Sequence, residues 1–99
     1  MYGTVARIKV KPSETENFLK LTQEWENDAG SVDGAIATYT YKLDNEPDTL
    51  IMSVVFRDKE SYFANANDPA QDVWFQKLRV LMAADPVWED GEIINSWTA

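Results

Sequence analysis

Residues 49–57 read TLIMSVVFR, and this stretch decides the fold because it is apolar on both faces of a strand. Side chains of a strand alternate between its two faces, so one face carries Leu50, Met52, Val54 and Phe56. The other face carries Ile51 and Val55. A strand with one face in water would alternate apolar and polar residues. The stretch therefore predicts a central strand of a sheet that is covered on both faces.

The residues before this strand predict a strand, a helix and a second strand. Residues 2–10 alternate with period two, as a strand does. Pro12 ends that strand, and Ser13 with Glu16 has the spacing of a capping box that begins a helix. The helix carries an apolar stripe formed by Phe18, Leu21, Thr22 and Trp25. Residues 28–34, which include two glycines, end this helix.

A hairpin and a broken helix follow. Residues 35–43 predict the second strand, and the dense turn signal of residues 44–48 joins it to residues 49–57. Asp58 is placed to cap a short helix that ends at Asn67. Asp68 and Pro69 then have the pattern of an N-cap and first helical residue, so a second helical segment begins there. Its apolar stripe is Trp74, Leu78, Leu81 and Met82.

The last strand is expected after Gly91, over residues 92–97, because Asp85 and Pro86 end the second helical segment. The order of elements is then β-α-β-β-α-β with a broken second helix. This order is typical of a ferredoxin-like α+β fold, in which both helices cover one face of a four-stranded antiparallel sheet. We expect one domain over residues 1–99.

The second face of the sheet predicts a homodimer. Helices on one side cannot cover Ile51 and Val55, and a second copy of the same sheet would do so. The alternative is that these two are central-strand residues lying under a long C-terminal segment.

Composition excludes several classes of function. The formal charge of −8 argues against a nucleic-acid partner and against an anionic membrane surface. The chain has no His and no Cys, which removes the commonest general base, the commonest haem ligand, thiolate nucleophiles and most zinc sites. The longest apolar run is too short to span a bilayer, and no signal peptide is recognisable. We therefore expect a cytoplasmic protein that needs no metal and no cofactor.

Three stretches carry a resemblance to a known family. They are residues 10–13 leading into the first helix, residues 38–41 through 55–56, and residues 56–65. In the third stretch an aromatic residue ends the strand, a capping residue follows two positions later, and then come an acidic and a small residue. In this pattern the chain resembles the antibiotic biosynthesis monooxygenase-like domains of the dimeric α+β barrel superfamily. Asn65 stands where that family commonly has His.

The resemblance implies a barrel made of two sheets packed face to face, with a cavity between sheet and helices in each subunit. Members of such families include cofactor-free oxygenases of polycyclic aromatic compounds, haem-degrading enzymes and proteins without known activity. The haem-degrading branch needs an axial His, so the absence of His excludes haem as a partner here.

Several side chains are candidates for contact with a small aromatic ligand. The aromatic candidates are Trp25, Tyr39, Tyr41, Phe56, Phe63, Trp74 and Trp88. Ordinary core packing explains aromatic residues at this spacing equally well. Asn65, and with it Asn67, sits at the helix break, where its amide would polarise a substrate carbonyl or cap backbone groups. Asn65 is the one candidate for a catalytic role.

Charged residues give weaker signals. Arg7 and Lys9 share a strand face, where they would meet a substrate anion or form cross-strand ion pairs. The carboxylates Asp85, Glu89, Asp90 and Glu92 crowd one turn, but their spacing matches no metal-binding loop, and we expect a solvated turn.

Two functions remain open at this stage. The first is a cofactor-independent monooxygenase acting on a small aromatic, hydroquinone or polyketide-like compound. The second is a non-catalytic dimer that binds a small hydrophobic ligand or serves as a structural module. An ordered, polar-lined cavity with a carboxylate or Tyr facing inward would favour the enzyme, whereas a space filled by Trp25, Trp74 and Phe63 would favour the second function.

Overall fold

The computed structural model describes residues 1–28 and 32–99. Its elements are β1 (Tyr2–Lys9), α1 (Thr15–Asp28), β2 (Ala35–Lys42), β3 (Thr49–Phe56), α2 (Lys59–Ala66), α3 (Pro69–Arg79) and β4 (Val87–Glu92). The strands form one antiparallel sheet in the order β2-β3-β1-β4. The predicted ferredoxin-like α+β fold is therefore confirmed, with the second helix broken into α2 and α3. No helix in the described ranges is long and apolar enough to cross a membrane.

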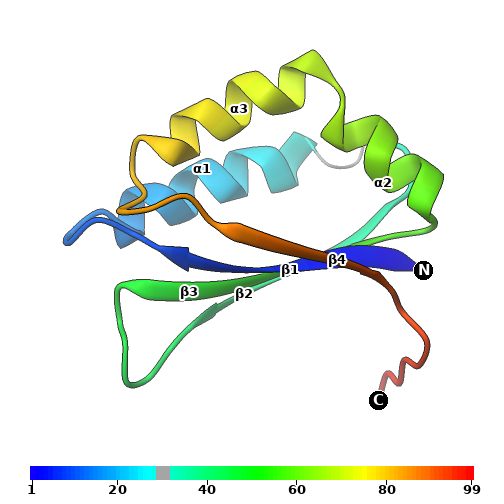
Figure 1. Cartoon of the computed structure of the whole chain (residues 1–99), viewed down its shortest axis with the longest axis horizontal. Coiled ribbons are helices and arrows are strands. Elements are labelled where there is room, and N and C mark those ends of the chain that lie inside the picture. The colour runs from blue at the N-terminus through cyan, green and yellow to red at the C-terminus, as the bar shows by residue number, and fades with distance from the viewer. Residues whose placement is uncertain (29–31) are drawn as a thin grey trace.

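The helices lie together on one face of the sheet, and the opposite face carries no helix (Figure 1). Cross-strand partners share a face of the sheet. Tyr39 pairs with Ser53 and Tyr41 with Ile51, and these residues lie on the face opposite to the buried Met52. Val5 is also on that face, because it pairs with Ser53 from the other side. We call this helix-free side the open face.

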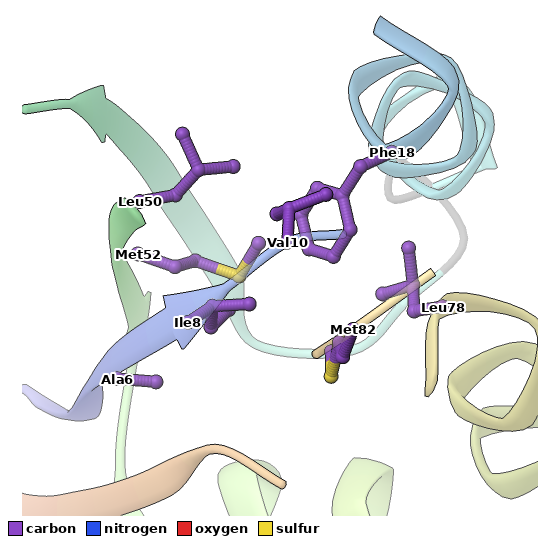
Figure 2. Close-up of a cluster of buried hydrophobic side chains, with 8 residues drawn as sticks. All are labelled: Ala6, Ile8, Val10, Phe18, Leu50, Met52, Leu78 and Met82. Carbon is purple, nitrogen blue, oxygen red and sulfur yellow. The ribbon is translucent and has the colours of Figure 1, made fainter. Parts of the chain in front are cut away.

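A packed core fills the space between sheet and helices at one end of the sheet. Ile8 and Leu50 face the helices from neighbouring strands, and Phe18 points toward them from α1 (Figure 2). Leu78 of α3 and Met82 close the cluster. Phe18 and Leu50 are completely buried. We call this region the packed end.

Two of the three predicted helix starts are confirmed. The Asp58 carboxylate accepts a hydrogen bond from the Ser61 N–H (2.8 Å), and the Asp68 carboxylate accepts one from the Ala70 N–H (2.8 Å). The predicted Ser13–Glu16 capping box is wrong. Ser13 adopts φ 68° in the turn before α1, and the carbonyl of Glu14 accepts the first helical hydrogen bond, from the Phe18 N–H. A residue in the left-handed region cannot be an N-cap, which needs extended backbone.

The predicted last strand is also wrong in position. β4 occupies Val87–Glu92, and it pairs with β1 from Arg7↔Val87 to Tyr2↔Glu92. Residues 93–99 form no strand. The error has a physical reason: β4 is an edge strand, and edge strands tolerate charged residues that prevent pairing with other chains. Its sequence VWEDGE therefore reads as a turn.

Candidate functional site

The opposite end of the layer between sheet and helices is hollow. A cavity of about 310 Å³ opens there, within the range of small-molecule sites. Its floor comes from the sheet through Thr4, Val54 and Phe56, and its roof comes from the helices through Trp25 and Trp74. We call this region the hollow end. Because the same strands β1 and β3 also build the packed end, the cavity has a rigid floor.

The indoles of Trp25 and Trp74 form one side of the cavity, with ring centroids 6.1 Å apart. The Trp25 Nε1–H donates to Gln71 Oε1 (3.0 Å), and the Trp74 Nε1–H donates to the backbone carbonyl of Leu21 (3.1 Å). These hydrogen bonds fix both rings and occupy their polar atoms. What the two indoles present to the cavity is therefore apolar ring surface.

A phenol and a carboxylate meet at the cavity. The Tyr62 hydroxyl, from α2, donates a hydrogen bond to Asp90 Oδ1 of β4 (2.9 Å), and both residues line the cavity. The Tyr62 ring packs among other aromatic rings, with centroid distances of 5.3 Å to Tyr2, 5.6 Å to Phe56 and 5.1 Å to Phe63. These ring contacts hold the phenol in one orientation.

The pKa of the Tyr62 phenol is raised to about 12. Burial is the largest cause, the hydrogen bond and negative charge of Asp90 add to it, and the nearby Thr4 hydroxyl partly opposes the rise. Tyr62 is therefore a neutral phenol at physiological pH. A neutral phenol donates a hydrogen bond and accepts another through its oxygen, so Tyr62 connects the cavity to the Asp90 carboxylate.

Thr4 adds a third oxygen to this end of the cavity. It lies directly across the β1–β4 ladder from Asp90 and is only 5% exposed. Among the described residues no group forms a hydrogen bond of normal geometry with Thr4 Oγ1, although the hydroxyl is near enough to influence Tyr62. Buried hydroxyls normally have a partner, so this atom is an exception that calls for a reason.

The structure brings most of the predicted site residues together. Those that line the cavity are Trp25, Phe56, Phe63, Asn65, Trp74 and Trp88. Trp88 lies at the exposed edge, 41% accessible, with its ring 6.0 Å from that of Phe75. Tyr39 and Tyr41 are not part of this group. Both are 59% exposed on the open face, because the register of β2 on β3 turns them away from the helices.

Sequence reasoning missed Tyr62 and Thr4, and it considered Asp90 only as one carboxylate of a solvated turn. Tyr62 lies in the family-like stretch 56–65, and its helical position four residues after the Asp58 cap could have drawn attention to it. The role of Asp90 could not be recognised because the last strand was predicted in the wrong place. Its position within β4 directs its side chain toward the helices. No local signal marks Thr4, since an alternating strand tolerates Thr on its buried face.

The weaker charged candidates lie elsewhere. Arg7 forms an ion pair with Glu46, so its partner lies in the turn between β2 and β3 and not on a neighbouring strand as expected. Asn67 is the C-cap of α2 and does not line the cavity. Asp85 pairs with Arg79 (2.9 Å). Among residues 1–28 and 32–99, no group of three His, Cys, Asp or Glu side chains is arranged to hold a metal ion.

Comparison with known families decides the assignment of the chain. The profile of the family described as antibiotic biosynthesis monooxygenase (ABM) matches residues 1–77. The chain belongs to the ABM family. The match contains Thr4, Tyr62, Trp25 and Trp74 of the cavity, whereas β4 with Trp88 and Asp90 lies beyond it. No curated protein matches the sequence of this ABM chain.

Solved structures share the ABM fold over nearly the full chain. The cofactor-independent oxygenase SnoaB from Streptomyces nogalater superposes with a TM-score of 0.83 at 13% identity, covering 96% of this chain and 94% of that one. A conserved protein from Methanosarcina mazei gives 0.81 at 19% identity, covering 91% and 89%. Rv0793 from Mycobacterium tuberculosis gives 0.81 at 11% identity, covering 98% of both chains. At these identities the likeness concerns the fold alone.

Proposed function

We propose that this ABM protein is a cofactor-independent monooxygenase that acts on a small aromatic compound of the hydroquinone or polyketide-like class. The observation that carries the proposal is the pairing of Tyr62 with Asp90 at a mainly apolar, aromatic cavity. The space is not filled by Trp25, Trp74 and Phe63, which line it, and a Tyr and a carboxylate border it. The open space, the Tyr and the carboxylate support the enzyme over a purely structural module, although the lining is less polar than expected of the enzyme.

The proposed reaction needs only a few groups from the protein, because the substrate itself reduces O₂. An acidic hydroquinone or anthrone loses a proton, and the resulting anion gives one electron to O₂. The two radicals then combine, and loss of water completes the change R₂CH₂ + O₂ → R₂C=O + H₂O. The protein supplies a dry cavity, a proton acceptor and hydrogen bonds to the substrate oxygen. Asp90 is the proposed acceptor, Tyr62 passes the proton to it, and Asn65 is placed to contact the substrate from the roof.

Oxygen uptake by chelator-treated protein tests this proposal. The substrates are a panel of reduced polycyclic compounds and simple hydroquinones, each compared with its uncatalysed rate. We expect uptake above background, a loss of about 10²–10⁴-fold in Asp90→Asn because a general base is removed, and a smaller loss in Asn65→Ala. Asp44→Asn, in the exposed turn between β2 and β3, is the control and should match the parent protein.

No uptake across the panel would reject the oxygenase. If the cavity nevertheless bound the aromatic compounds, the protein would be the non-catalytic ligand-binding module. A cytoplasmic location stays a prediction of the sequence.

We also propose that two copies pack through their open faces and form the dimeric α+β barrel. Support comes from the exposed apolar side chains of that face. They are Val5, Tyr39 and Tyr41, accessible at 46%, 59% and 59%, and Val87 at 69%. Exposed apolar side chains gathered on one face of a sheet are typical of an interface.

Sedimentation velocity tests the dimer. Tyr41→Glu places a charge on the open face and should shift the parent dimer to monomer, whereas Glu60→Gln on exposed α2 should not. A monomeric parent protein at micromolar concentration would contradict the proposal.

A further inference from the structure

Two buried threonines border the cavity, and only one of them has its hydroxyl satisfied. Thr22 of α1, 4% exposed, donates its hydroxyl hydrogen to the backbone carbonyl of Leu19 (2.8 Å). Thr4 of β1 is equally buried, at 5% exposed, yet its Oγ1 forms no hydrogen bond of normal geometry with any described residue, although it lies near the Tyr62 hydroxyl. A buried hydroxyl without a partner destabilises a protein, and Val has nearly the same shape without this cost. The cost indicates that the hydroxyl serves a ligand.

The neighbours of Thr4 define what such a ligand must offer. The Tyr62 hydroxyl hydrogen is already directed to Asp90 Oδ1, so the Tyr62 oxygen has only acceptor capacity left for a ligand. The Thr4 hydroxyl has both donor and acceptor capacity. One group can accept from Thr4 and donate to Tyr62 at the same time, and that group is a hydroxyl. A ligand carbonyl or ether oxygen can use only the first of these two hydrogen bonds.

The negative charge of Asp90 narrows the class of ligand further. The Asp90 carboxylate is hydrogen-bonded at this end of the cavity, and an aromatic carboxylate placed beside it would bring two negative charges together. The remaining surface is mainly aromatic and aliphatic, including Val54, Phe56 and Trp74. The ligand that fits is a neutral, flat aromatic molecule with a hydroxyl at one end.

We propose that Thr4 is a ligand-binding residue, whose buried hydroxyl donates a hydrogen bond to the hydroxyl of an aromatic ligand, while that ligand hydroxyl donates to Tyr62 and is thereby selected over the matching ether or carboxylate. The hydrogen bonds then run from ligand to Tyr62 to Asp90, the path on which the proton leaves in the proposed reaction. The inference rests on the proposed function only in that both use the same cavity. Binding by Thr4 and Tyr62 does not require turnover.

Calorimetric titration under anaerobic conditions tests this selection without turnover. The probes are 1-naphthol, 1-methoxynaphthalene and 1-naphthoate, which share one ring system and differ in the oxygen group. We expect the parent protein to bind 1-naphthol about tenfold more tightly than the ether, roughly the value of one extra hydrogen bond. Naphthoate should bind most weakly.

Thr4→Val should bind naphthol and the ether each about tenfold more weakly than the parent protein, because both lose the hydrogen bond from Thr4, and it should also melt at a higher temperature. The preference for naphthol should remain, because it comes from the hydrogen bond that naphthol donates to Tyr62. Thr22→Val is the matched control, because it removes a buried hydroxyl that already has a partner. It should melt at a lower temperature and keep the parent affinities for both probes. The combination of higher stability with weaker binding of both probes in Thr4→Val is not expected of a merely structural hydroxyl.

Unchanged affinities for naphthol and the ether in Thr4→Val would overturn the proposal, and they would mean that the hydroxyl holds only a water molecule. Failure of all three probes to bind would overturn it as well. Binding that depends on Thr4, in a protein without oxygen uptake, would support this inference while rejecting the oxygenase. Oxygen uptake without that dependence would do the reverse.

Discussion

The two ends of the layer between sheet and helices are built by the same strands and differ in how they are filled. At the packed end, Ile8 of β1 and Leu50 of β3 are covered by Phe18 and are buried almost completely. At the hollow end, Thr4 of β1 and Val54 of β3 border a cavity of about 310 Å³. A strand therefore does not determine by itself whether the space above it is filled.

The helices account for the difference. α1 and α3 close over the packed end through Phe18 and Leu78, whose side chains meet the strands. Over the hollow end the second helix breaks at Asn67 and Asp68, and α2 and α3 run in different directions there (Figure 1). Large rings fixed by hydrogen bonds border the gap and cannot collapse into it as aliphatic side chains would. The break therefore keeps a ligand-sized space open in a small domain.

Truncating one aromatic residue at each end should give the largest difference in stability cost between the two ends. Phe18→Ala leaves a void in a completely buried cluster and should cost about 3–5 kcal/mol of unfolding free energy. Phe63→Ala only enlarges an existing cavity, and it should cost about 1 kcal/mol, near the average for a point mutation. Urea denaturation followed by circular dichroism measures both. Equal costs would contradict the distinction between the ends.

Enlarging one side chain at each end tests the same difference in packing from the opposite direction. Ala6→Leu overpacks the buried cluster and should cost about 1–3 kcal/mol. Val54→Leu grows into the cavity and should leave stability within about 0.5 kcal/mol of the parent while weakening naphthol binding. The same denaturation experiment and a binding titration measure the two effects. A strongly destabilised Val54→Leu protein would show that the hollow end has no free space.

Exchanging for valine the two buried threonines that border the cavity sharpens the comparison on a smaller scale. Thr4→Val removes an unsatisfied buried hydroxyl at the hollow end and should raise the unfolding free energy by about 1 kcal/mol. Thr22→Val removes a hydroxyl that is bonded to Leu19 and should lower it by about 0.5–1.5 kcal/mol. Thermal unfolding checks the signs, and the account fails here if both variants shift in the same direction.

The smallest effect concerns alkaline pH. The folded-state pKa of Tyr62, about 12, lies above the ordinary value of 10.0, so the folded state holds this proton more tightly than the unfolded state. The contribution to stability is complete below about pH 10 and is lost as pH rises from about 10 to 12. Tyr62→Phe should therefore lose less stability over that interval than the parent protein. Urea midpoints at pH 9 and pH 11 measure this, and equal losses would contradict it.

Local signals made much of the fold predictable. Asp58 and Asp68 were recognised as caps because an N-cap depends on a few neighbouring residues. The two-faced pattern of residues 49–57 correctly indicated a central strand with one face toward the helices. The prediction of Ser13 as an N-cap was wrong because no sequence pattern marks a left-handed backbone at residues other than Gly and Asn.

The site was only partly predictable. Trp25, Phe63 and Trp74 were found because aromatic residues on a helix facing the sheet border whatever space exists there. The Tyr62–Asp90 hydrogen bond joins residues 28 positions apart, so it depends on the register of an edge strand that the sequence placed five residues too late. Whether a layer is filled or hollow depends on helix directions, which periodicity does not encode.

The indole N–H resonances of the four tryptophans give the most direct test that the hollow end binds an aromatic ligand. Trp25, Trp74 and Trp88 line the cavity, whereas Trp97 is 84% exposed in the C-terminal segment and is an internal control. In a ¹H–¹⁵N titration with 1-naphthol, the account predicts that the three cavity indoles shift together and that Trp97 does not. Shifts confined to Trp97, or no shift at saturating naphthol, would contradict it.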